Sequence, residues 1–288
     1  MIKYFQLVQK IHIHPLFWGV AGLAIITGYF WELLALFLIV IFHEMGHAIA
    51  AQYFAWRIQR IQILPFGGIC IVDEHGNKPM KEELLIILAG PVQHILLAIL
   101  ILILQYFSVV TPEYMQLFLQ FNLMILIFNL LPVWPLDGGK LVQLFLASRK
   151  PYIVAFKQSV ISSLIMLLAL HVFVLIISPL NVQIWIVLIY LYIGLWLEWK
   201  QHQFTFMKFL LERHYGKKQD LRQIQSIDAH GDEFLYQSME KFRRDCKHII
   251  HVGDEKMLIG KLDENELLHA YFNEKQVNAK LKEIVYYD

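Results

Sequence analysis

Residues 43–47 read His-Glu-Met-Gly-His, a spacing that can hold a metal ion. In an α-helix, residues four positions apart lie on nearly the same face, so His43 and His47 can present two imidazoles to one cation. A catalytic zinc ion takes three protein ligands and a water molecule, and a neighbouring carboxylate removes a proton from that water. The motif therefore predicts two zinc ligands, His43 and His47, and a general base, Glu44.

These three ionisable side chains lie inside an apolar run of the chain. An ionisable group at the centre of a membrane helix costs at least about 2.5 to 3.5 kcal/mol unless it is paired or bound. The same five-residue pattern also arises by chance in chains as rich in histidine as this one, and the alternative is a hydrogen-bonded cluster between helices. The apolar setting favours the metal site.

A third ligand must come from another segment at the same depth. A later apolar run ends at Leu131 and is followed by Pro-Val-Trp-Pro-Leu-Asp-Gly-Gly. Pro132 and Pro135 interrupt the helix, and the two glycines permit a tight turn. Asp137, the only carboxylate in this run or its break, is the predicted third ligand. The alternative is that Asp137 and Gly138 form an ordinary turn at a helix end.

The composition places the chain in a lipid bilayer. Hydrophobic residues make up 57% and charged residues 17%, with a mean hydropathy of +0.50, outside the range of soluble domains. Two distant cysteines provide neither a disulfide framework nor a thiolate zinc site. A net charge of +1, without basic runs interleaved with aromatics, argues against nucleic acid as a partner.

Six apolar runs of about spanning length predict six transmembrane helices. They are Pro15–Phe30, Leu33–Tyr53, Leu84–Val110, Met115–Leu131, Tyr152–Ile177 and Val182–Trp199. Lys and Arg occur in alternate connections, which predicts that both termini are cytoplasmic. His47 and His43 precede the inner end of their helix by about 9 to 15 Å, so the site is expected in the cytoplasmic half of the membrane.

The remaining segments predict a hairpin and a soluble tail. Residues 57–64 and 69–72 alternate like two strands around Gly67 and Gly68, and this hairpin is expected to hold an extended substrate by strand addition. Charged residues increase from about Lys200. The predicted organisation is a six-helix membrane domain at 1–199, a linker at 200–220, and a small cytoplasmic α/β domain at 221–288.

The motif at 43–47, together with Asn-x-x-Pro-x-x-x-x-Asp-Gly at 129–138, resembles the site-2 protease family of intramembrane zinc metalloproteases, peptidase family M50. The resemblance implies cleavage of a peptide bond in or near the membrane, with zinc on His43, His47 and Asp137 and water activated by Glu44. It also implies that Asn129 and Pro135 help to seat the substrate.

The overall organisation indicates a branch of this family, and one position in the third apolar run differs from many relatives. The six segments and small C-terminal domain are similar to the sporulation members, which remove the pro-sequence of a pro-sigma factor in the mother-cell membrane around the forespore. Membrane inhibitor or regulator proteins are then expected partners. Many relatives have an asparagine where this chain has His94, so His94 either touches the site or serves helix packing and hydrogen bonding.

Residues 226–270 resemble a single CBS motif. Such motifs work in pairs, which implies a homo-oligomer. Relatives that bind adenine nucleotides often have a hydroxyl where this chain has Asp263, whose carboxylate would repel phosphate, although Glu266 could accept ribose hydroxyls. ATP binding at these two residues is one expectation, and substrate docking or assembly is the other.

Two other classes of protein fit parts of the pattern. A transporter or channel regulated by a CBS-like domain would use the buried histidines as an ion pathway, and Glu44→Gln would then change ion flux. A zinc-binding scaffold without activity would not need Glu44, which is intact. The prediction is a polytopic α-helical membrane zinc metalloprotease with a small cytoplasmic α/β CBS-like domain.

Overall fold

The computed structural model describes Leu7 and residues 9–64, 67–72, 76, 78–216, 223–254 and 257–285 of the 288-residue chain. Its contacts divide the chain into two compact units. The first unit comprises residues 1–74, 81–141 and 163–194, and the second comprises residues 75–80, 142–162 and 195–288.

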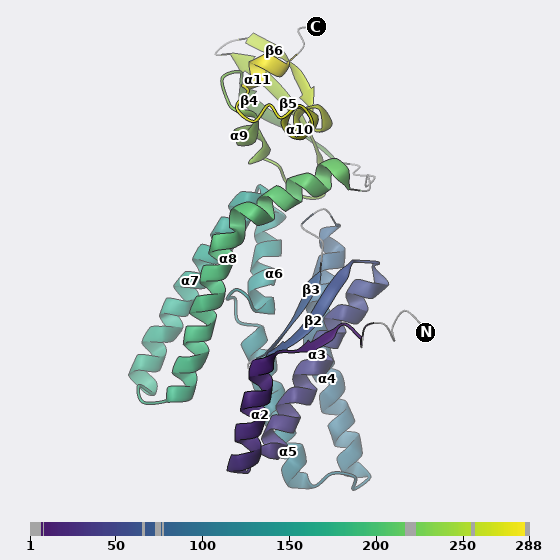
Figure 1. Ribbon diagram of the computed structural model, residues 1–288, viewed down its shortest axis with the longest axis vertical. Helices are drawn as coiled ribbons and strands as arrows, with labels where there is room; N and C mark the ends of the chain where they lie inside the picture. Colours follow the sequence, from purple (N-terminus) through teal and green to yellow (C-terminus); the bar gives the residue numbers. More distant parts are fainter. Residues whose placement is uncertain are drawn as a thin grey trace. The chain divides into compact units, whose positions relative to one another are not determined.

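Local sequence explains where helix α2 of the first unit begins and ends. Helix α2, Pro15–Thr27, begins where the His14 side chain accepts a hydrogen bond from the Leu16 amide, and it ends at Gly28, which has a left-handed backbone. Helix α3, Phe30–Tyr53, carries the 43–47 motif and packs beside α2 (Figure 1).

The next helices supply the other sides of the site. Helix α4 is Met80–Tyr106. Helix α5, Pro112–Asn129, begins at Thr111, whose side chain accepts from the Tyr114 amide. Helix α6, Asp137–Ala147, begins at the predicted third ligand. The pattern of prolines and glycines did not predict this helix.

Two long helices, α7 at Tyr152–Ile177 and α8 at Val182–Tyr215, follow. All six predicted apolar runs are therefore helical over most of their length. Four described helices, α3, α4, α7 and α8, are long and apolar enough to cross a membrane. Helix α2, with 13 residues, is shorter than the about 20 residues that a span needs. The chain is thus mostly helical with four candidate spans, and the count of six stays a prediction.

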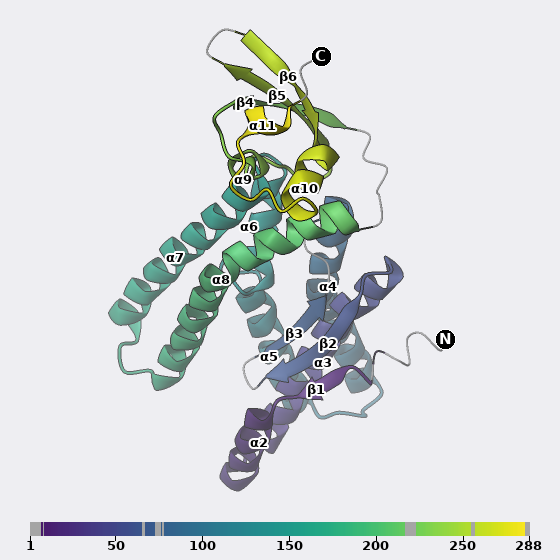
Figure 2. The same cartoon turned by 45° about the horizontal axis from the view of Figure 1, so that its top comes forward.

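A three-stranded sheet lies beside α3 in the first unit (Figure 2). Strands β2, Ile58–Leu64, and β3, Gly67–Val72, pair antiparallel as the predicted hairpin, while Pro65 and Phe66 at its turn lie outside the described residues. Strand β1, Ile11–Ile13, was not predicted and pairs parallel with β2. Alternate residues of β2 are buried in one core with residues of α3, which fixes the sheet against the helix.

The second unit contains the predicted α/β elements of the tail. Its sheet has the order β4-β5-β6, with β4 parallel to β5 and β5 antiparallel to β6. Phe206 and Phe209 of α8 are fully buried in its core. The elements of the tail are β4 Ile224–His230, α9 Leu235–Met239, β5 Lys247–Asp254, β6 Met257–Asp263, α10 Glu264–Phe272 and α11 Leu281–Ile284.

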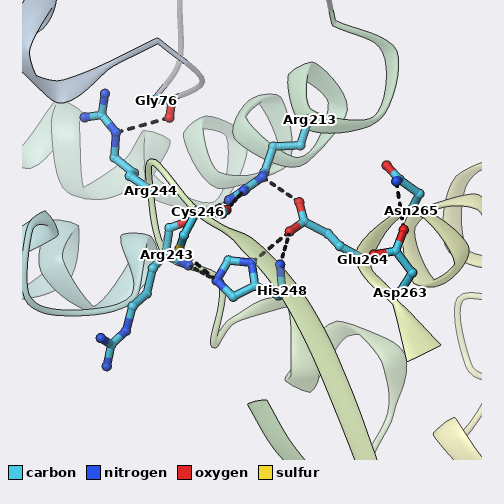
Figure 3. Close-up of polar contacts among 9 residues, drawn as sticks. All are labelled: Gly76, Arg213, Arg243, Arg244, Cys246, His248, Asp263, Glu264 and Asn265. Carbon is cyan, nitrogen blue, oxygen red and sulfur yellow. Dashed lines mark hydrogen bonds and ion pairs between the residues drawn. The ribbon is translucent and has the colours of Figure 1, made fainter. Parts of the chain in front are cut away.

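The predicted linker at 200–220 differs from the structure over most of its length, because α8 continues as a helix to Tyr215. A buried ion pair joins the end of this helix to the tail, with Arg213 Nε at 2.6 Å from Glu264 Oε1. The other oxygen of Glu264 lies 2.8 Å from His248 Nδ1 (Figure 3). Each buried charge thus has a partner, which is the condition for burying charge without a large penalty.

Candidate active site

Three side chains from two helices converge in the first unit. The Nε2 atoms of His43 and His47 lie 3.1 Å apart, and they are 3.1 and 3.0 Å from Oδ2 of Asp137. All three side chains are buried. Together they form a group of ligand atoms that could hold a metal ion.

The positions of these atoms follow from the two helices. His43 and His47 are one turn apart on α3, as their spacing predicts. Asp137 is the first residue of α6, so its side chain is placed by a helix start rather than by a loop. Two ligands bound at about 2.0–2.1 Å to a tetrahedral zinc ion are about 3.4 Å apart, close to the observed spacing.

The hydrogen bonding at the site fits a cation. Nδ1 of His47 lies 2.8 Å from the carbonyl oxygen of Ile86, which can only accept, so Nδ1 donates and Nε2 of the neutral ring keeps its lone pair. Oδ2 of Asp137 is buried and receives no hydrogen bond from the part of the chain that the structure describes. Electron-rich atoms facing each other in a buried site require positive charge between them, and nitrogen and carboxylate donors suit zinc.

The second oxygen of Asp137 has a different partner. Lys140, one turn further along α6, places Nζ 3.1 Å from Oδ1. This contact leaves Oδ2 as the oxygen that faces the histidines.

The backbone of α4 approaches the two histidine rings very closely. A Cβ atom at Gly90 would lie 2.3 Å from His47 Nε2 and 2.8 Å from His43 Cε1. No real Cβ atom is found so close to a neighbour, so residue 90 must be glycine for the rings to keep these positions. Helix α4 therefore approaches the two rings through its backbone at Gly90.

Glu44 borders a small cavity of about 40 Å³ that is also lined by two of the ligands, His43 and Asp137. That volume is enough for a water molecule. The predicted positioning residues Gly67, Gly68, Asn129 and Pro135 all line the same cavity. The structure therefore gathers these four residues, from β3, α5 and the segment before α6, around Glu44.

Gly68 brings β3 against the predicted base. A Cβ atom at this position would lie 2.3 Å from Cγ of Glu44. Since β3 is at one end of the strand order, the strand that borders Glu44 is also an edge of this sheet among the described residues.

The two residues predicted to contact a nucleotide lie in the second unit. Glu266 accepts a hydrogen bond from the Asp263 amide. Asn265 donates to the Asp263 carboxylate (Figure 3). The contact between Asp263 and Glu266 belongs to a capping box at the start of α10. It gives both residues a structural role.

Sequence reasoning missed several residues at the site. Asn122 lies on α5 about two turns before Asn129, and Lys140 follows Asp137 by one turn, so helical spacing from the known candidates was the available signal. Tyr190 of α8 lines the cavity without any such signal.

Known proteins with similar sequences include zinc metalloproteases, as the geometry of the site suggests. The sequence model described as Peptidase family M50 matches residues 31–114 and 108–173. The chain is 42% identical over 285 residues to stage IV sporulation protein FB of Bacillus subtilis (strain 168), and the match covers 99% of both chains. It is 34% identical over 144 residues to a zinc metalloprotease of Methanocaldococcus jannaschii, covering 48% of this chain and 42% of that one.

A solved structure shows the same relationship. The site-2 protease from Methanocaldococcus jannaschii has a TM-score of 0.53 and 30% sequence identity, over 65% of this chain and 89% of that one. The resemblance that the sequence motifs predicted is confirmed. The chain belongs to peptidase family M50 and is an intramembrane zinc metalloprotease of the site-2 protease type.

Proposed function

We propose that His43, His47 and Asp137 hold one zinc ion and that Glu44 is the general base for peptide hydrolysis. The observation that carries the proposal is the triangle of buried ligand atoms, no more than 3.1 Å apart, beside a cavity bordered by Glu44. Bound zinc lowers the pKa of water and polarises a carbonyl group. Glu44 would take the proton from the attacking water and deliver it to the leaving nitrogen.

We propose that the substrate lies as an extended strand along β3. The edge position of β3 and its contact with Glu44 at Gly68 support this arrangement, because strand addition would bring a peptide bond past the base. Asn129 and Pro135, which line the same cavity, would then contact the peptide near the cleaved bond.

The proposed substrate is a membrane-associated pro-sigma factor, whose pro-sequence the enzyme removes. The near full-length match to a sporulation protein supports a role in sporulation. Six spanning helices with both termini cytoplasmic, in the mother-cell membrane around the forespore, would place the site within reach of such a substrate.

The tail at 221–288, which is part of the second unit, is proposed to act as a CBS-like domain that pairs between subunits. Its β4-β5-β6 sheet with α10 matches the expected order of elements. Regulation by membrane inhibitor proteins is also proposed. For the tail, substrate docking or assembly is the preferred proposal over ATP binding, because Asp263 and Glu266 already cap α10.

Co-expression with a pro-sigma factor tests the substrate. Wild type is expected to yield the shortened factor, whereas Glu44→Gln at equal expression leaves it intact. A pro-sigma factor that stays intact with wild type, while another membrane-associated peptide is cleaved, would refute the substrate and leave the protease activity standing.

A further inference from the structure

Helices α4 and α5 supply a chain of hydrogen bonds that ends on His43. Nδ2 of Asn122 donates to the carbonyl oxygen of His94 at 2.8 Å, which orients the amide. Oδ1 of Asn122 then faces His94 Nδ1 at 2.8 Å, and His94 Nε2 lies 3.0 Å from His43 Nδ1. All three side chains are buried in the first unit.

The direction of each hydrogen bond follows from the group at the far end. Oδ1 of Asn122 can only accept, so Nδ1 of His94 carries a proton and donates it. In a neutral imidazole the other nitrogen, Nε2, is then an acceptor, and it must receive the Nδ1 proton of His43. His43 therefore keeps its lone pair on Nε2, the atom that faces His47 and Asp137.

Helix α4 thus provides the acceptor for both histidines. His47 donates to the backbone carbonyl of Ile86, and His43 donates to the side chain of His94, two turns further along the same helix. Pro91 lies between these two positions and lacks the amide that would bond back to Ile87, which loosens the helix there.

We propose that His94 and Asn122 are positioning residues that fix the tautomer and the ring orientation of His43. Neither is proposed to touch the substrate. The inference deepens the zinc site proposed above and rests on it. Partners of this kind orient metal ligands, and their loss typically weakens metal affinity about 10–100-fold. A packing role would depend on the volume of the imidazole and not on its acceptor.

Two substitutions separate the acceptor from the volume. His94→Phe removes the acceptor and keeps an aromatic ring, whereas His94→Gln keeps an oxygen acceptor near the position of Nε2. The measurement is the zinc affinity of the purified full-length chain in detergent, by competition with a chromophoric chelator. We expect His94→Phe to bind zinc about 10–100-fold more weakly, and His94→Gln to recover most of that loss.

His171→Phe is the matched control, because it makes the same change in another apolar helix, α7, where the ring contacts Trp185 and Tyr192. Its zinc affinity should equal that of wild type. Asn122→Leu tests the far end of the chain of hydrogen bonds and should also weaken zinc binding.

Wild-type zinc affinity in His94→Phe would overturn the proposal, and so would equal losses in His94→Phe and His94→Gln. If His94→Phe does not give a monodisperse protein, Asn122→Leu decides, and unchanged affinity in that variant overturns the proposal. A wild-type chain that binds no zinc would instead refute the site itself. Because zinc affinity is measured without a substrate, these results are distinct from a failure to find the natural substrate.

Discussion

At the scale of single residues, the zinc site depends on the space left beside two imidazole rings. Gly90 of α4 fills that space with backbone alone. A methyl group there would have to displace His47 or His43, since its contacts would be far inside van der Waals distance.

Gly90→Ala is therefore expected to weaken zinc binding by about tenfold or more and to lower cleavage with it. Gly19→Ala is the matched control, because a Cβ atom at Gly19 in α2 would meet nothing within 4 Å. Zinc titration of both variants provides the measurement. Wild-type zinc affinity in Gly90→Ala would show that the rings can shift without loss and would contradict this account.

Single residues also show how far sequence could predict the site. His43, Glu44 and His47 could be predicted because their spacing matches one face of a helix, and Asp137 because it was the only carboxylate near the break. The partners of His94, which are His43 on one side and Asn122 on the other, could not be predicted in the same way. Their contacts join α3, α4 and α5, and the relative rotation of three helices is set by packing rather than by local pattern.

At the scale of elements, β3 is the feature that links the fold to the proposed substrate. Its edge borders Glu44, and a substrate strand would use backbone hydrogen bonds to this edge. Ile69→Pro removes one backbone amide and disturbs the strand, whereas Ile69→Val keeps the amide and a branched side chain.

We expect Ile69→Pro to reduce cleavage strongly and to leave zinc content near that of wild type, because the ligands come from α3 and α6. Ile69→Val should cleave at close to the wild-type rate. Cleavage measured on purified protein in lipid vesicles checks both. Unimpaired cleavage by Ile69→Pro would count against strand addition.

Elements differed in how clearly the sequence showed them. The hairpin of β2 and β3 alternates strongly enough to be predicted, but β1 has three residues and depends on pairing with β2 across a long sequence separation. Helix α6 begins with Asp-Gly-Gly, which is typical of a turn because glycine is a poor helix former. The helix nevertheless begins at Asp137, in spite of that local preference.

At the scale of the whole molecule, composition was the strongest predictor. The predicted apolar runs are helical, and four of the described helices are long and apolar enough to cross a membrane. The predicted elements of the tail are present in the second unit. The continuation of α8 to Tyr215 was not predicted, because its charged sequence resembles a linker. Buried phenylalanines on this part of α8 show that it belongs to a folded core instead.

The central claim is that a zinc ion on His43, His47 and Asp137 works together with Glu44 as the base. The most direct measurement is the cleavage rate of the purified full-length Glu44→Gln variant in lipid vesicles, with zinc content determined on the same sample. The account predicts the same zinc content as wild type and a loss of cleavage of about 100-fold or more, since the base but no ligand is removed. Cleavage at the wild-type rate by a zinc-loaded Glu44→Gln variant would contradict it.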